Sequence, residues 1–131
     1  YYSRPERTAQ KVLTAVYTMD EAEIQKRREA IDNKTFDTYM RERCDGAVTD
    51  KCTEGMIAAC ALYYGATPAK VESIKFSPID KATSDTASFQ YTAVFSDDSD
   101  AKERIGHVVM KKENGKWRVD SFVTKSVTKA D

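Results

Sequence analysis

Residues 110–122 read Met-Lys-Lys-Glu-Asn-Gly-Lys-Trp-Arg-Val-Asp-Ser-Phe, and this stretch decides the fold. Asn114 and Gly115 at its centre accept the positive φ angles of a type I′ turn, the turn that matches the twist of a two-stranded hairpin. Residues rich in Val, Ile, Phe and Thr lie on both sides, which predicts strands over 104–112 and 117–125. The end of the chain is therefore predicted to be an antiparallel hairpin.

The segments before this hairpin keep the period of two that is typical of strands. Residues 71–79 and 86–96 predict two further strands, the first of which ends near Pro78. One face of the second strand is apolar and carries Phe89, Tyr91, Ala93 and Phe95. We expect that face to be core and the other to be mostly polar. The short connections predict a four-stranded antiparallel meander.

In the first half of the chain the period changes to 3.6. Ser3-Arg4-Pro5-Glu6 is a capping box, and it leads into a helical stripe formed by Ala9, Val12, Leu13, Val16 and Tyr17. Asp20 and Glu23 repeat the capping signature for a second helix. Its charged run, residues 25–29, is expected to face solvent.

Two more helices are predicted before the sheet. Phe36, Tyr39 and Met40 mark the apolar face of a short one. The other runs over about 49–64 and stops at Gly65. Because its second half is apolar almost all round, we expect it to be the most buried helix.

Length and charge limit the class of protein. The chain has 131 residues with 40% apolar and 32% charged side chains, which fits a single globular domain over 1–127 with a frayed tail at 128–131. Cations and anions balance at 21 each, so we expect no nucleic-acid partner. No apolar run reaches about 18 residues, which predicts no membrane span in this segment. Tyr1 is no initiator Met, so we expect an excised or processed piece whose membrane anchor, if any, lies upstream.

The three cysteines, Cys44, Cys52 and Cys60, are spaced by eight residues. With a single histidine this spacing fits no zinc site, and we expect neither a metal nor a cofactor. We predict a disulfide between Cys44 and Cys52 across the flexible stretch around Gly46, with Cys60 buried. The alternative is three reduced thiols in a cytoplasmic protein.

This order of helices and strands, closed by the Gly-Lys-Trp hairpin, resembles the nuclear-transport-factor-2-like superfamily, a cone of α+β class. The resemblance implies N-terminal helices packed on a curved antiparallel sheet of about four strands, with Trp117 packed inward. Members of this superfamily include isomerases, dehydratases, transport factors, secreted lipoprotein domains, and assembly-factor domains of type IV secretion and conjugation machines. Fold alone does not select among them. The predicted disulfide and the truncated start favour the extracytoplasmic branch, secreted or membrane-anchored.

Candidate pocket residues are the few polar groups that such a cone could enclose. His107 shares a strand face with Ile105 and Val109, where an imidazole can act as a base or an orienting donor near neutral pH. The predicted tyrosines of the pocket are Tyr17, Tyr39, Tyr63 and Tyr91. The bland alternative is that these aromatic side chains fill the core and that the histidine is an ordinary strand residue.

The carboxylates suggest no catalytic set. Asp120 alternates with Trp117, Val119 and Val123, so it points outward if those three point inward. Asp37 lies beside Phe36 on a helix and gives no firm orientation. The acidic loop at 97–100 lacks the glycine and the distal glutamate of a calcium loop, and we expect a solvated turn there. We therefore assign no catalytic residues.

Our leading hypothesis is a non-catalytic extracytoplasmic module that binds protein, either as a homodimer across the sheet or within an envelope assembly. Val94, Val108 and Phe122 are expected on the outward face of the sheet for that purpose. The alternative is a small-molecule binder or isomerase-like enzyme that uses the cone. A third reading is a structural spacer in a longer protein.

Overall fold

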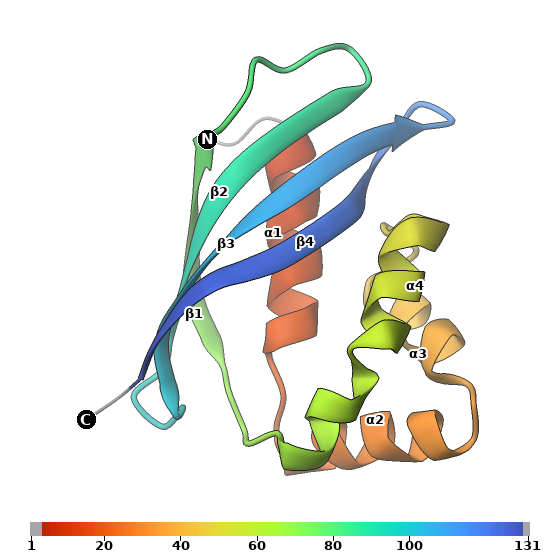
Figure 1. Ribbon diagram of the computed structural model, residues 1–131, viewed down its shortest axis with the longest axis vertical. Helices are drawn as coiled ribbons and strands as arrows, with labels where there is room; N and C mark the ends of the chain where they lie inside the picture. The colour runs from red at the N-terminus through yellow and green to blue at the C-terminus, as the bar shows by residue number, and fades with distance from the viewer. Residues whose placement is uncertain (1–3, 130–131) are drawn as a thin grey trace.

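A computed structural model describes residues 4–129 of the protein, and it confirms the predicted α+β class. Four α-helices and one 3₁₀ helix precede a four-stranded sheet (Figure 1). The helices are α1 (Arg4–Tyr17), α2 (Glu21–Asp32), α3 (Phe36–Arg43), α4 (Asp50–Ala58) and η1 (Cys60–Gly65). The strands are β1 (Val71–Pro78), β2 (Thr86–Phe95), β3 (Ala101–Glu113) and β4 (Lys116–Lys129). Neighbouring strands pair antiparallel in the order β1-β2-β3-β4, so the sheet is an open meander.

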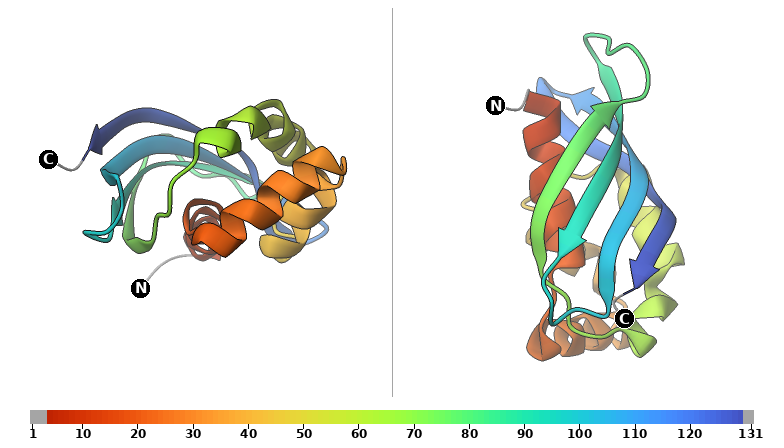
Figure 2. Two further views of the ribbon diagram at one scale, coloured as in Figure 1. Left: turned by 90° about the horizontal axis from the view of Figure 1, so that it is seen from below. Right: turned by 90° about the vertical axis from the view of Figure 1, so that its left-hand side faces the viewer.

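The sheet curves, and the helices lie on its concave side. The view from below shows the sheet as an arc, with α1 inside it and the other helices gathered at one end (Figure 2). Helix α1 buries the predicted apolar stripe against the inner face of the sheet, and its buried residues are Ala9, Val12, Leu13 and Val16. Ser3 of the predicted capping box lies outside the described residues. Each helix of the described range is too short or too polar to cross a lipid bilayer.

The side chains of Asp20 and Thr49 cap two helix starts. Asp20 accepts a hydrogen bond from the backbone N–H of Glu23 and opens α2, as predicted. Thr49 does the same for the backbone N–H of Cys52 and opens α4, while its hydroxyl donates to Asp120 at 2.8 Å. Asp120 therefore fixes the start of α4 to β4. It does not face solvent as a free carboxylate.

The fourth predicted helix is wrong in length and in burial. It ends at Ala58, and the chain continues as the 3₁₀ helix η1. Most of the apolar run from Ile57 to Tyr64 is exposed, and η1 has no buried residue. The cause is a tertiary contact. The Arg28 guanidinium donates hydrogen bonds to the carbonyls of Tyr63 and Tyr64 and holds this part of the chain against α2.

The β3–β4 hairpin has the predicted turn. Asn114 and Gly115 adopt φ angles of 52° and 77°, the left-handed values that a type I′ turn requires. Both strands are longer than predicted. Thr128 and Lys129, expected in a frayed tail, pair with Glu103 and Ala101. The rest of that tail, residues 130–131, lies outside the described residues.

An irregularity at Asp120 reverses the faces of β4. Met110 pairs with Val119 and Val109 pairs with Ser121, so one residue of β4 is left over between the two pairs. Phe122 then packs inward and Val123 is exposed, the reverse of our expectation for both. Val108 was also expected outside but is fully buried.

All three cysteines are free thiols, so the predicted Cys44–Cys52 disulfide is wrong. Cys44 ends α3 and Cys52 lies in the first turn of α4, and both sit in the hydrophobic core. Burial raises the pKa of Cys44 to about 11 and that of Cys52 to about 12. They act as small apolar side chains. Cys60 is partly exposed, whereas we expected it to be buried.

Candidate functional site

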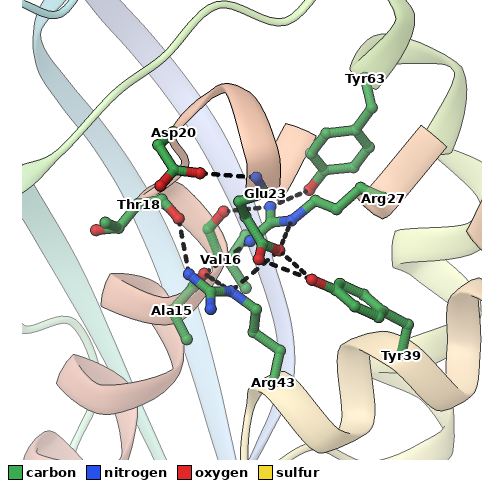
Figure 3. Close-up of polar contacts among 9 residues, drawn as sticks. All are labelled: Ala15, Val16, Thr18, Asp20, Glu23, Arg27, Tyr39, Arg43 and Tyr63. Carbon is green, nitrogen blue, oxygen red and sulfur yellow. Dashed lines mark hydrogen bonds and ion pairs between the residues drawn. The ribbon is translucent and has the colours of Figure 1, made fainter. Parts of the chain in front are cut away.

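The helical half holds a cluster of five residues, here called the buried ion-pair cluster: Glu23, Arg27, Tyr39, Arg43 and Tyr63, with Arg43 at its exposed edge (Figure 3). Arg27 is fully buried, and its Nε donates a hydrogen bond to Oε2 of Glu23 at 2.8 Å. The Nε of Arg43 lies 3.2 Å from the same oxygen. The Tyr39 hydroxyl donates to the same carboxylate and lies 2.7 and 2.8 Å from its two oxygens. Two cations and one phenol therefore surround a single carboxylate.

The two arginines also hold the end of α1. The terminal nitrogens of Arg27 donate to the carbonyls of Val16 and Ala15 at 2.7 and 2.9 Å, and Arg43 donates to the carbonyl of Thr18 at 3.0 Å. Carbonyls in the last turn of a helix lack intrahelical partners and carry partial negative charge. The guanidinium groups supply both the donors and the opposite charge. The cluster thus fixes α1, α2 and α3 together.

Tyr63 connects this cluster to η1. Its hydroxyl accepts a hydrogen bond from Arg27 at 3.3 Å, and its ring lies under the Arg27 guanidinium at 5.2 Å. The ring centroid of Phe36 is 5.5 Å away. Together with the Arg28 bonds to the carbonyls of η1, these contacts tie the 3₁₀ helix to α2 and α3.

Burial and the contacts of the cluster raise the pKa of Tyr39. Burial, followed by the hydrogen bond to Glu23 and its negative charge, raises the pKa of Tyr39 to about 12. Tyr39 therefore stays a neutral donor at physiological pH. Both oxygens of Glu23 already accept hydrogen bonds, so this carboxylate is not poised as a general base.

We had expected residues 25–29 to face solvent, and for Arg27 and Arg28 that expectation is wrong. Arg27 is fully buried and Arg28 is partly buried. From the sequence, Glu23 was singled out only as part of a capping signature, and Arg43 was not singled out at all. The one local signal was the spacing of Glu23 and Arg27, which places them one helical turn apart.

Anchoring of η1 leaves apolar side chains in solvent next to the cluster. Ile57 is 43% exposed, Leu62 is 76% exposed and Tyr64 is 52% exposed. We call these three residues the η1 surface. The alanines between Ile57 and Leu62 are exposed as well, and the hydroxyl of Tyr64 donates to Asp32 at 2.6 Å, which fixes its ring.

The predicted pocket tyrosines divide into two groups. Tyr39 and Tyr63 belong to the buried ion-pair cluster, whereas Tyr17 and Tyr91 meet at the inner face of the sheet with their hydroxyl oxygens 2.6 Å apart. Burial and the neighbouring Tyr17 raise the pKa of Tyr91. A Cβ on Gly106 would lie 2.5 Å from the Tyr91 ring, so the absent side chain makes room for it.

His107 does not join these tyrosines. It pairs with Gln90 of β2, an exposed residue next to buried Tyr91, so the imidazole lies on the outer face of the sheet. It does share that face with Val109, as predicted, but the face is not the inner one. A pocket that contains both His107 and the four tyrosines is therefore ruled out.

A hollow of about 370 Å³ opens beside the buried ion-pair cluster. It lies between the α1–α2 connection, α2 and the segment before β1, and its lining includes Glu23, Arg43 and Lys26. None of the four predicted tyrosines lines it. Glu23 and Arg43 are already paired with each other, so the hollow gains no unpaired acid or base from the cluster. Within residues 4–129, no three His, Cys, Asp or Glu side chains gather as a metal site would need.

Comparison with known proteins gives no assignment. The sequence matches no model of a protein family, and no curated protein matches it significantly. What the fold and the site define is a class: an α+β domain with an open antiparallel sheet, a buried ion-pair cluster that locks its helices, and an exposed apolar surface held in place by that cluster.

Proposed function

We propose that this protein is a non-catalytic interaction module that binds another protein through the η1 surface. The observation that carries the proposal is the exposure of Ile57, Leu62 and Tyr64 on a backbone that is anchored from within. Single exposed apolar residues are ordinary on protein surfaces, but several within eight consecutive residues, on an anchored backbone, favour a binding site.

The anchoring contacts explain why this apolar run does not bury itself. Tyr63 points inward to Arg27, so its neighbours Leu62 and Tyr64 are directed outward by the same tight helical turn. Burying the side chain of Leu62 against a partner contributes about 1.5–3 kcal/mol, the usual gain for a leucine removed from water. An anchored surface also loses little conformational entropy on binding.

The chemistry around the surface fits a protein rather than a nucleic acid or an anionic membrane. Exposed charges of both signs lie on the adjoining elements: Lys51 and Glu54 on α4, and Asp32 at the end of α2, which accepts from Tyr64. Nucleic acids and anionic lipids require an excess of cations, whereas a mixed polar rim around an apolar centre is usual for protein interfaces.

We further propose kinship with nuclear-transport-factor-2-like proteins, from the order of helices and strands alone. The extracytoplasmic location leaned on a disulfide, and the thiols are free. Val108 and Phe122, which we expected on a dimerising face of the sheet, pack in the interior. The η1 surface therefore replaces that face as the proposed binding site.

The test is co-isolation of the full-length, tagged protein with its partners from its own cells. Leu62→Asp should abolish recovery of a discrete partner, because an aspartate would be buried without a counterion. Val109→Asp is the control, since Val109 is also an exposed apolar residue but lies on the outer face of the sheet. If Val109→Asp removes the partner and Leu62→Asp does not, the η1 surface is not the binding site.

A further inference from the structure

Arg104 is an arginine of the inner face of the sheet, near the end of α1. In the register it pairs with Ala93, which is fully buried, so its side chain points to the concave side. Its guanidinium lies over the ring of Tyr17 at 4.8 Å, and its Nη1 donates to the hydroxyl of Thr124 at 2.8 Å.

The polar contacts of Arg104 are incomplete. Its Nε is buried and has no hydrogen-bond partner among the described residues. Across the same range no carboxylate lies close enough to form an ion pair with it. Arg27 and Arg43 differ in that both form an ion pair with Glu23. A partly buried cation with an unsatisfied donor is destabilising unless an anion completes it.

The ring of Tyr17, over which this guanidinium lies, belongs to an aromatic group on the inner face of the sheet. It packs edge-on to Phe95 and Phe122, with centroids 6.2 and 6.1 Å apart. Its hydroxyl meets that of Tyr91 at 2.6 Å. An unpaired positive charge thus lies beside a phenol that contacts further aromatic rings.

We propose that Arg104 binds the carboxylate of a small organic acid whose apolar body packs against Tyr17 and Phe122. The planar fork of a guanidinium matches a carboxylate with two parallel hydrogen bonds, and one of these satisfies Nε. The aromatic edges favour an organic acid over an inorganic anion. This site is separate from the η1 surface and does not depend on the function proposed for it.

The experiment is a titration of the protein with sodium benzoate, monitored by nuclear magnetic resonance of the arginine Nε–H groups. We expect a saturable shift of the Arg104 Nε–H resonance, and no saturable shift with benzyl alcohol, which lacks the charge. Arg104→Gln should weaken benzoate binding at least about tenfold, since a charge-assisted hydrogen bond contributes roughly 1.5–3 kcal/mol. Lys102→Gln, the control, removes an exposed charge from the same strand and should leave binding unchanged.

Three results would overturn the proposal. They are an Arg104 resonance that does not respond to benzoate at millimolar concentration, benzoate binding that Arg104→Gln leaves intact, and inorganic phosphate binding as tightly as benzoate. If Arg104→Gln fails to fold, the response of the Arg104 Nε–H resonance to benzoate in the unaltered protein still tests the proposal. Arg104→Lys keeps the charge and should bind benzoate more weakly than the unaltered protein, because lysine lacks the fork.

Discussion

Glu23 and Arg27 form an ion pair one helical turn apart on α2, with 2.8 Å between Oε2 and Nε, where Arg27 has no exposed surface. The pair does not stand alone, since the same arginine also holds two carbonyls of α1 and the hydroxyl of Tyr63. This interior network reaches η1 through Tyr63, and we infer that it sets the exposure of the η1 surface.

Glu23→Gln should destabilise the fold by about 3 kcal/mol, because it leaves the fully buried Arg27 without a counterion. Glu29→Gln is the control, since Glu29 lies on the exposed face of the same helix. Urea denaturation followed by circular dichroism measures both. A loss from Glu23→Gln no larger than that of the control would show that the cluster is not an anchor.

Tyr39→Phe should change how stability depends on alkaline pH. The pKa of Tyr39 is raised to about 12 in the folded protein from a usual value of 10.0, so the unfolded chain releases this proton first. The contribution of the neutral phenol is complete below pH 10 and is lost as the pH rises toward 12. The difference in stability between the unaltered protein and Tyr39→Phe should therefore shrink over that window. A difference that is constant from pH 9 to 12 would contradict the assignment.

Gly106→Ala should destabilise the protein by at least about 3 kcal/mol, because the new Cβ would lie 2.2 Å from the carbonyl oxygen of Val123 and 2.5 Å from Tyr91. Gly55→Ala is the matched control, since nothing lies within 4 Å of its added Cβ in the middle of α4. That control should be neutral or stabilise by about 0.5–1 kcal/mol. Thermal melts of the two variants should shift in opposite directions or by clearly different amounts.

The cysteines should react in two classes with a disulfide reagent at pH 8. Burial raises the pKa of Cys44 and Cys52, and both lie in the core, so neither offers an accessible thiolate. Cys60 is partly exposed and should react first. One thiol per chain should titrate in the native protein and all three in urea. Rapid reaction of two thiols in native protein would show that the α3–α4 contact opens.

Parts of the fold could be predicted because their signals are local. The Asn114-Gly115 turn and the alternation in β2 need only the preferences of the residues concerned. The irregularity at Asp120 escaped prediction because it depends on the bond from Thr49, which comes from a distant segment. The end of α4 at Ala58 was missed for the same reason, because it depends on hydrogen bonds from Arg28 in a distant segment.

The candidate site was less predictable than the fold. Tyr39 and Tyr63 were singled out as pocket residues, but Arg27, which donates to Tyr63, was expected to face solvent. An arginine is buried only where acceptors converge on it, and here those acceptors are Glu23 and the carbonyls at the end of α1. No local pattern in residues 25–29 indicates that these acceptors lie around Arg27.

The most direct measurement is photo-crosslinking in living cells, with a photoreactive amino acid placed at position 62 of the full-length protein. A matched probe at position 109 reports the outer face of the sheet. We expect position 62 to yield one discrete adduct with another protein, and Ile57→Lys to abolish it, while position 109 yields none. An adduct at position 109 without one at position 62 would contradict the central claim that the η1 surface contacts a partner.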